Sequence, residues 1–259
     1  MSGSGDRYQP STYGDRIADV YDDIYLHAPI FGEVSFPVAF LASLANGGPA
    51  LELGVGTGRI ALPLQAAGVQ VHGIDASTAM VEGLRAKPGG GDIDVTIGDF
   101  RDFALTTRFP LVYVVFNTFF GLLSQDDQVT SFRAVARHLA PGGAFVMEAF
   151  VPDLARFDRG QRVSAIRVDP DSVSLEVTQN DPVGQTTDSQ RVVIREDGIR
   201  LYPVKIRFAY VSELDLMARL AGLRLRERWA DWDRTPFSSA SPKHISVWEL
   251  DPEALNAMG

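Results

Sequence analysis

The sequence contains no cysteine, so neither a disulfide framework nor a thiolate metal site can form. Its 4 histidines are scattered without spaced partners, and we expect no metal site. A basic excess is also missing: the formal net charge is −9, whereas binding along nucleic-acid backbones needs a positive surface. The longest apolar run, Leu111 to Leu123, is interrupted by Asn117 and is too short to span a bilayer. Because the polar N-terminus also has no apolar signal region, we expect a cytoplasmic protein without nucleic-acid or membrane partners.

Short apolar runs alternate with amphipathic stretches through most of the chain. The predicted strands are Ala50–Leu53, Val69–Ile74, Asp94–Ile97, Leu111–Phe116, Ala144–Ala149, Leu223–Asp231 and His244–Leu250. The predicted helices between them are Arg59–Ala67, Ser77–Lys87, Ser124–Leu139 and Ser212–Gly222, the last two opened by capping boxes. This alternation predicts an α/β fold: a doubly wound, seven-stranded, mostly parallel sheet with helices on both faces.

Two segments depart from that rhythm. The first is an N-terminal helical cap segment, residues 1–46, which precedes the alternating strands and helices. It contains an amphipathic helix beginning at Gly14 and a second helix over Glu33–Asn46. The second segment, residues 160–208, interrupts the alternating strands and helices. It contains no convincing helix, and Asp197-Gly198 is typical of a hairpin turn. We therefore expect an antiparallel β unit inserted between a core at 47–159 and its completion at 209–259. This unit either covers the substrate or forms a dimerisation sheet, so a homodimer is possible.

The turn after the first strand is rich in glycine, at Gly54, Gly56 and Gly58. Glycines let the backbone approach a ligand closely, and the helix behind them presents free N–H groups. A dinucleotide fingerprint requires glycine at the next position, where this chain has Arg59. The turn therefore favours a ligand other than a pyrophosphate, although a purely structural turn is the alternative.

Acidic residues follow the next two strands. Asp75 stands where a carboxylate accepts both hydroxyls of a ribose, although it also suits the N-terminus of the following helix. Asp99 and Phe100 are placed to bind an adenine, although an aspartate in a loop is commonplace. Phe116 ends the fourth strand, at the sheet edge where ligands bind.

Four motifs occur in order on the expected strands: Glu52–Gly58 (Glu-Leu-Gly-Val-Gly-Thr-Gly), Gly73–Ser77, Gly98–Phe100 and Leu139–Gly143. Together they resemble the class I S-adenosylmethionine (SAM)-dependent methyltransferases over roughly residues 50–150. Within that family the chain is similar to small-molecule enzymes such as the amino-sugar N,N-dimethyltransferases. Those proteins carry a histidine after the fourth strand, whereas here Gly121 stands near its place.

The resemblance implies SAM as cofactor and assigns residues to it. Gly54 and Gly56 would border its methionine part, Asp75 its ribose with Ala76 and Met80 beside it, Asp99 and Phe100 its adenine, and Phe116 its sulfonium end. Tyr13 and Tyr21 match tyrosines that close over the cofactor in the subgroup, although Tyr21 also suits helix packing. Arg59 would either meet the cofactor carboxylate or be solvated.

The sequence leaves the acceptor open. An amine acceptor needs no base in the transition state, whereas a hydroxyl usually benefits from one. Glu148, His27 and His244 are the candidates for that role, and His72 and His138 are expected to be structural. Possible pocket residues are Arg200, Tyr202, Trp229 and Trp232. We predict transfer of a methyl group to N or O of a small molecule, a secondary metabolite or amino sugar. The alternatives are a SAM-binding protein with a cyclase-like or regulatory role and a nucleotide-binding interaction domain.

Overall fold

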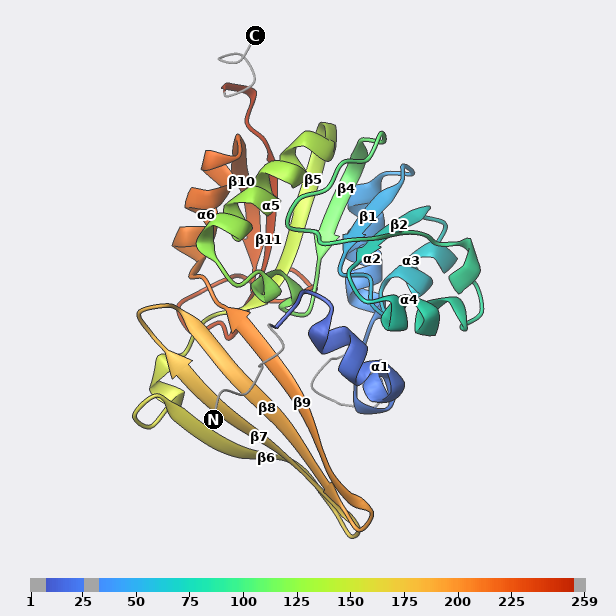
Figure 1. Ribbon diagram of the computed structural model, residues 1–259. Helices are drawn as coiled ribbons and strands as arrows, with labels where there is room; N and C mark the ends of the chain where they lie inside the picture. Colours follow the sequence, from blue (N-terminus) through green and yellow to red (C-terminus); the bar gives the residue numbers. More distant parts are fainter. Residues whose placement is uncertain (1–7, 26–32, 254–259) are drawn as a thin grey trace.

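The computed structural model describes residues 8–25 and 33–253 and contains two β-sheets (Figure 1). The larger has seven strands in the order β10-β11-β5-β4-β1-β2-β3. Their bounds are β1 Ala50–Leu53, β2 Val71–Asp75, β3 Asp94–Ile97, β4 Phe109–Val114, β5 Leu139–Phe150, β10 Leu223–Trp229 and β11 Lys243–Leu250. Strand β11 runs antiparallel to both of its neighbours, and the other pairings are parallel. The predicted seven-stranded, mostly parallel sheet is therefore confirmed.

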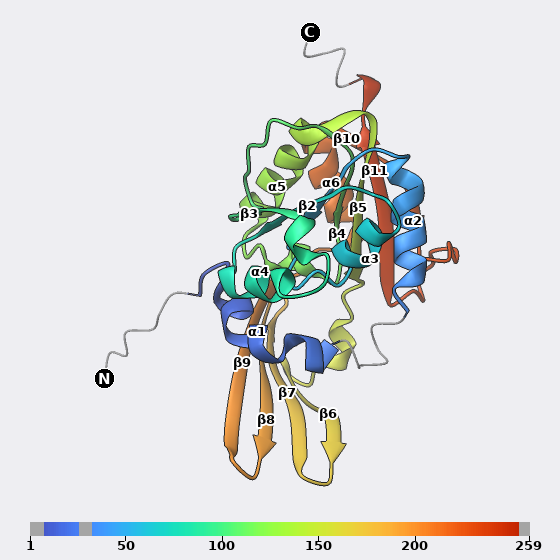
Figure 2. The same cartoon turned by 90° about the vertical axis from the view of Figure 1, so that its right-hand side faces the viewer.

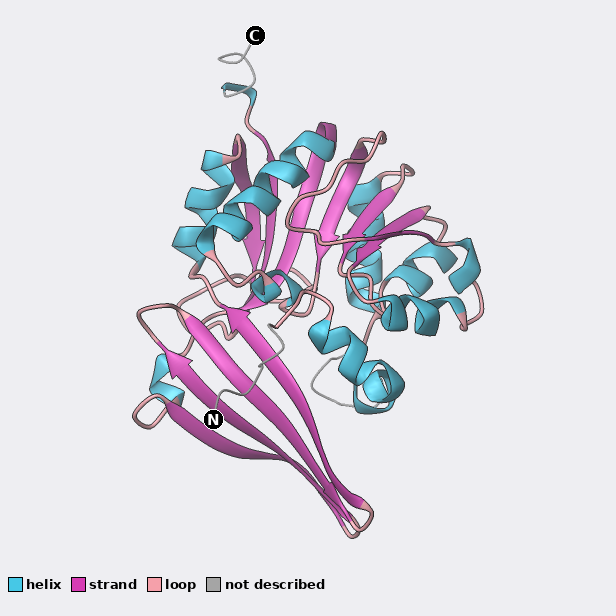
Figure 3. Cartoon of the chain, viewed as in Figure 1, coloured by secondary structure: helices cyan, strands magenta, loops and turns pink. Residues whose placement is uncertain are grey.

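Helices cover both faces of this sheet, as Figure 3 shows. One face packs against α5 (Gln125–His138) and α6 (Val211–Leu220), and the other against α2 (Ser35–Ala45), α3 (Ala61–Ala66) and α4 (Thr78–Arg85). Strand residues alternate between the two layers, as a pleated strand requires: Leu51 and Leu53 pack on the α5 side, and Ala50 on the α2 side. Helix α2 therefore packs directly on the core sheet, in the same layer as α3 and α4.

The carboxyl ends of β1 and β4 lie side by side, where the chain order reverses. From β1 the chain continues to β2 and β3 on one side of the sheet, whereas β4 and β5 lie on the other side. In open α/β sheets, ligands bind at such a switch point. The backbone there is strained, because Phe116 and Asn117 after β4 have φ angles of 56° and 62°.

The second sheet consists of the predicted antiparallel insertion. Its order is β6-β7-β8-β9, with bounds β6 Gln161–Asp169, β7 Ser172–Asp181, β8 Thr186–Arg195 and β9 Gly198–Arg207. It projects from the carboxyl edge of the core, and helix α1 (Thr12–Tyr25) lies against one of its faces (Figures 1 and 2). Ile17 of α1 is buried there with Val193 and Tyr202.

A buried polar network joins the end of this insertion to the core helices. The Arg207 guanidinium donates to Gln128 of α5 at 2.6 Å, to Gln185 at 3.1 Å and to Glu213 of α6 at 2.7 Å. Burial works against the charge on Glu213, but the hydrogen bonds from Arg207, Gln185 and Gln125 lower the pKa of its carboxyl. Arg207, at the end of β9, therefore anchors the inserted sheet to α5 and α6.

Several local predictions are wrong: strands β2 and β4 begin at Val71 and Phe109 rather than at Val69 and Leu111, and three further boundaries differ. Ser212 does not cap α6, because Tyr210 is the extended residue before the helix and α6 begins at Val211. Strand β5 begins at Leu139 rather than Ala144, because Leu139 already pairs with Phe109 before a shift in register. Helix α3 begins at Ala61, two positions after the predicted Arg59.

Candidate functional site

The glycine turn lies at the switch point between β1 and the start of α3. Gly54 has φ +73°, and a Cβ atom there would come 2.4 Å from Cγ2 of Thr118 and 3.9 Å from Cε1 of Phe100. A side chain at this position would therefore be both strained and obstructed. The backbone N–H of Gly54 donates to the carbonyl of Ile74 at 2.7 Å, which fixes the loop beside the end of β2. Thr118 therefore packs directly against the turn at this position.

Asp75, the last residue of β2, holds the loop and the next helix together. Its Oδ2 accepts the N–H of Gly56 at 2.8 Å, and its Oδ1 accepts the N–H of Ser77 at 2.9 Å. Burial raises the pKa of this carboxyl, and the two N–H donors partly offset that effect. Each carboxylate oxygen keeps a second lone pair, so the group can still accept from a ligand.

The other residues predicted to border the ribose, and those predicted to bind the adenine, lie next to Asp75. Met80, in the first turn of α4, reaches the loop: its Cε lies 3.3 Å from where a Cβ of Gly56 would stand. Ala76 is half-buried beside Asp75. Asp99 accepts the N–H of Arg101 at 2.8 Å, and its neighbour Phe100 packs against the core cluster. The structure thus brings the predicted ribose and adenine residues to one edge, where their roles stay predictions.

Arg59 and Phe116 meet on the other side of the turn. The guanidinium carbon of Arg59 lies 3.8 Å from the centre of the Phe116 ring, a stacked cation–π contact. Burial lowers the pKa of Arg59, while the nearby Tyr21 and Glu148 act in the opposite direction. Arg59 is therefore half-buried between the tyrosine helix and the end of β4, and a contact with the cofactor carboxylate stays a prediction.

Glu148 is buried, with 7% of its surface exposed, and three donors occupy its carboxylate. Its Oε1 accepts from Trp232 Nε1 at 3.1 Å and from Lys243 Nζ at 3.3 Å, and its Oε2 accepts from the N–H of Phe116 at 3.3 Å. Burial opposes the charge on Lys243, but Glu148 and Asp231 raise the pKa of its ammonium group. Glu148 therefore supports the strained end of β4.

The predicted lid tyrosines both belong to α1. Tyr13 and Tyr21 are half-buried and pack against the cluster of Ile17, Val193 and Tyr202 between α1 and the inserted sheet. Tyr21 is also close enough to Arg59 to influence its charge. Helix packing and closure over the glycine turn are thus compatible for Tyr21.

The histidines differ in their surroundings. His27 lies outside the described residues. His244 is fully buried on the face of the sheet opposite Glu148, because Glu148 pairs with Ile245. His244 Nδ1 lies 2.8 Å from Ser246 Oγ, which also accepts from Arg228 at 2.7 Å, and no described residue is a hydrogen-bond partner of its buried Nε2. Burial lowers the pKa of His244 to about 3. Full burial keeps the His244 ring neutral and away from solvent, and its role as a base stays a prediction.

The other two histidines lie in structural positions. His138 Nδ1 lies 2.7 Å from the Ala134 carbonyl oxygen, within α5, and its Nε2 accepts from the N–H of Leu105 at 2.9 Å. His72 Nδ1 lies 3.4 Å from Asp94 on the neighbouring strand β3.

The four suggested pocket residues do not gather in one place. Tyr202 packs on α1, and Trp232 binds Glu148. Arg200 is exposed near the far hairpin, whereas Trp229 pairs with Ile245 in the core sheet. Tyr202 thus contacts the tyrosine helix and Trp232 contacts Glu148, whereas Trp229 packs against the core cluster that includes Trp232.

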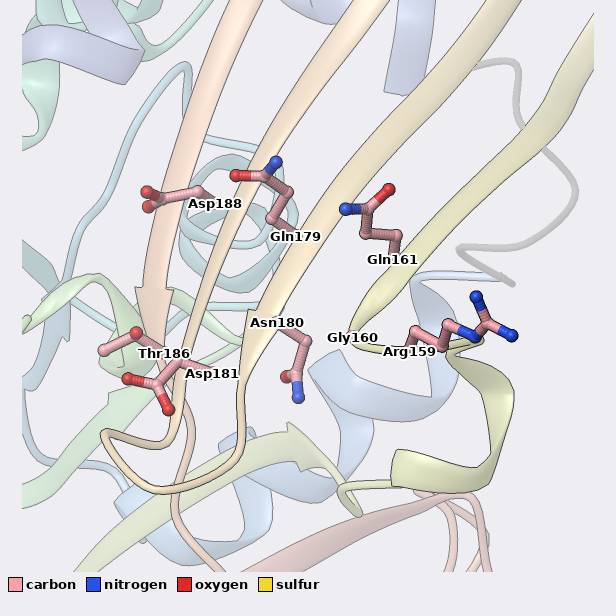
Figure 4. A pocket seen from close by; sticks show the side chains of 8 residues that line it. All are labelled: Arg159, Gly160, Gln161, Gln179, Asn180, Asp181, Thr186 and Asp188. Carbon is pink, nitrogen blue, oxygen red and sulfur yellow. The ribbon is translucent and has the colours of Figure 1, made fainter.

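A separate polar hollow of about 320 Å³ lies at the base of the inserted sheet (Figure 4). Its lining includes Gln161, Gln179 and Asp188, which form one row across β6, β7 and β8. Within residues 8–25 and 33–253, no group of three acidic or histidine side chains is arranged to hold a metal ion. None of the helices in the described ranges is long and apolar enough to cross a membrane.

Several contact residues were not predicted from the sequence. Asp22 of α1 and Lys87 after α4 meet over the glycine turn at 2.6 Å, and Lys243 binds Glu148. The sequence gives little indication of these contacts, because a charged residue on a helix or at a strand end is usually solvated.

Comparison with known proteins identifies relatives over most of the chain. A family model described as a methyltransferase domain matches residues 50–143. The cypemycin N-terminal methyltransferase of Streptomyces sp is 30% identical over 245 residues, which cover 93% of this chain and 98% of that protein. A dTDP-4-amino-2,3,4,6-tetradeoxy-D-glucose N,N-dimethyltransferase of Saccharopolyspora spinosa is 33% identical over 144 residues, covering 53% of this chain and 56% of that protein. The solved CcbJ methyltransferase from Streptomyces caelestis is 40% identical with a TM-score of 0.89, over 94% of this chain and 100% of that one.

Proposed function

This chain belongs to the methyltransferase family, and we propose that it transfers a methyl group from SAM to an amine nitrogen of a small molecule. The enzyme class follows from the family, whereas the choice of nitrogen is our own inference. A non-methylating role for the SAM-binding fold is less well supported, because the relatives that match the chain are named as methyltransferases.

The described residues fit SAM as the cofactor. The turn at Gly54 has a backbone that only glycine fits, and Asp75 is a fixed acceptor next to it. When bound, SAM supplies a methyl group on a positively charged sulfur, which is already activated for displacement. The protein's contribution is to hold the acceptor in line and to exclude water. Phe116 and Arg59 border the place where that transfer would occur.

The hydrogen bonds that Glu148 already accepts are the observation that supports an amine acceptor. A hydroxyl acceptor benefits from a base, and Glu148 is the best-placed carboxylate at this edge. Its oxygens already accept from Trp232, Lys243 and the N–H of Phe116. A neutral amine, in contrast, attacks without prior loss of a proton. The names of two relatives also specify a nitrogen acceptor, an N-terminus in one case and an amino sugar in the other.

Matched acceptors test this proposal. The purified protein is incubated with SAM and with pairs of small molecules that differ only in an amine or a hydroxyl, including amino sugars and peptides with free N-termini. We expect release of S-adenosylhomocysteine with the amines only. Turnover of the hydroxyl compounds at equal or greater rates would refute the amine assignment. Tight SAM binding with no turnover of any acceptor would instead favour a non-methylating role.

The inserted sheet, which we regard as the cover of the acceptor, has unusual faces. Its inner face, towards α1, is largely polar, with Thr178, Ser189 and Glu176. Its outer face instead exposes apolar side chains, each 38% to 71% accessible: Val163, Val168, Val177, Ile194, Ile199 and Leu201. Apolar residues gathered on one exposed face typically mark an interface. A two-fold partner would present the same apolar face, so we propose a homodimer.

Light scattering coupled to size exclusion tests the homodimer. We expect the mass of two chains for the native protein and of one chain for Ile199→Asp with Leu201→Asp. A single-chain mass for the native protein across accessible concentrations would contradict it. We retain the cytoplasm as the proposed compartment, which fractionation of cells expressing the tagged protein would test.

A further inference from the structure

Helix α1 touches the glycine turn through one acidic side chain. Oδ1 of Asp22 accepts the hydroxyl proton of Thr57 at 2.7 Å, and Oδ2 lies 2.6 Å from Nζ of Lys87. The same Nζ donates to the backbone carbonyl of Thr57 at 2.8 Å. Thr57, which stands between two glycines of the turn, is buried. Asp22, Thr57 and Lys87 therefore form a closed ring of hydrogen bonds, which we term the α1 latch.

A second contact connects α1 to the predicted ribose carboxylate. Oδ1 of Asp15 accepts the hydroxyl proton of Ser77 at 2.6 Å, and the N–H of Ser77 donates to Asp75 at 2.9 Å. The two helices approach closely because Gly14 has no side chain: a Cβ there would lie 2.6 Å from Cβ of Ser77. Docked α1 thus contacts Thr57 directly and Asp75 through Ser77.

The opposite side of α1 is held independently. Ile17 is buried against Val193 and Tyr202 of the inserted sheet. Breaking the latch leaves the helix with its apolar contacts and with the Asp15–Ser77 contact, so its loss should loosen α1 at the glycine turn without unfolding it. The latch is only partly exposed, with 33% of the Asp22 side chain and 25% of the Lys87 side chain accessible. A pair of this kind is stronger than a solvated one but still responds to salt.

We propose that Asp22 and Lys87 are positioning residues that couple the docking of α1 to the shape of the glycine turn, and thereby set the rate at which the demethylated cofactor leaves. This inference rests on the proposed function, because it requires the cofactor to bind at that turn. Neither residue takes part in methyl transfer itself. A helix that must separate from Thr57 before the site opens makes product release slower than it would be in an open site.

Dissociation of S-adenosylhomocysteine measures this coupling directly. The protein is loaded with radiolabelled S-adenosylhomocysteine and chased with an excess of unlabelled compound. We expect Asp22→Asn and Lys87→Met each to raise the dissociation rate roughly tenfold, the loss expected for one charge-assisted hydrogen bond. The double variant should exceed either single variant only slightly, since both remove the same ring. Rising salt should accelerate release from the native protein more than from the double variant.

Asp19→Asn is the matched control, because it removes the same charge from an exposed position of the same helix. Asp22→Glu should restore part of the slow release. Melting temperatures of all variants establish that they fold. If Asp22→Asn releases the compound as slowly as Asp19→Asn does, the latch proposal is wrong while the cofactor site stands. If the native protein does not bind S-adenosylhomocysteine at all, the proposed function fails and the latch fails with it.

Discussion

The hydroxyl of Tyr113 donates to the carboxyl of Glu52 at 2.9 Å, inside the core directly beneath the glycine turn. Both side chains are almost fully buried, and burial raises the pKa of Glu52 to about 8, with Asp75 adding to the effect. A carboxyl whose pKa is higher in the folded than in the unfolded protein contributes stability at low pH and loses it as pH rises. For Glu52 this stability is lost as the pH rises from about 4.5 to about 8.

Glu52→Gln should therefore change how stability depends on pH. We expect the free energy of unfolding of the native protein, relative to the variant, to fall by roughly 3–5 kcal/mol across that window. Urea titrations at several pH values measure this difference. Glu249→Gln, at a surface ion pair with Arg224, is the control and should leave the slope unchanged. Parallel curves for native protein and Glu52→Gln would contradict the raised pKa.

Asp75 is expected to control affinity for the cofactor. Asp75→Ala leaves the N–H groups of Gly56 and Ser77 without their acceptor and removes the predicted ribose contact. Calorimetry should show SAM binding weakened roughly 50-fold, equivalent to about 2 kcal/mol. Asp75→Asn should be nearly as harmful, since an amide can accept from only one of the two N–H groups. Unchanged affinity, matching that of the exposed control Asp92→Asn, would remove the ribose assignment.

Glu148→Gln distinguishes a positioning residue from a base. The variant keeps an oxygen for Phe116 or Trp232 but loses the attraction to Lys243, so we expect kcat to fall roughly tenfold. The shape of the pH–rate profile should stay that of the native enzyme, because the carboxylate moves no proton. Asp231→Asn, which also loses a contact to Lys243 but does not touch Phe116, is the control. Disappearance of one ionisation from the profile would instead identify Glu148 as the base.

Removing the buried charge of Arg207, at the base of the inserted sheet, should lower the stability of the protein. Arg207→Met leaves the Gln128 oxygen without its donor and the partly buried Glu213 without its ion-pair partner, and we expect about 3 kcal/mol loss of unfolding free energy. Arg224→Met at an exposed pair should cost less than about 1 kcal/mol. Equal effects of the two substitutions would contradict the anchoring role of Arg207.

Features confined to neighbouring residues could be predicted from the sequence, and features joining distant ones could not. Strands β1 and β3 match their predicted ends, and Ser77 caps α4 as expected, because strand, turn and cap signals are local. The start of β5 was hidden by a Pro-Gly-Gly stretch that ordinarily ends a strand. The partners of Glu148 and of Asp22 come from distant segments, and only the folded chain brings them together.

Transfer of a labelled methyl group tests the central claim most directly. The protein is incubated with SAM that carries ¹³C in its methyl group and an equimolar mixture of small amines, amino sugars, phenols and alcohols. The carbon chemical shift of the product then distinguishes a methyl group on nitrogen from one on oxygen. The account predicts label on nitrogen only, in the native protein and, more slowly, in Glu148→Gln. Label on oxygen, or SAM binding that never yields a labelled product, would contradict it.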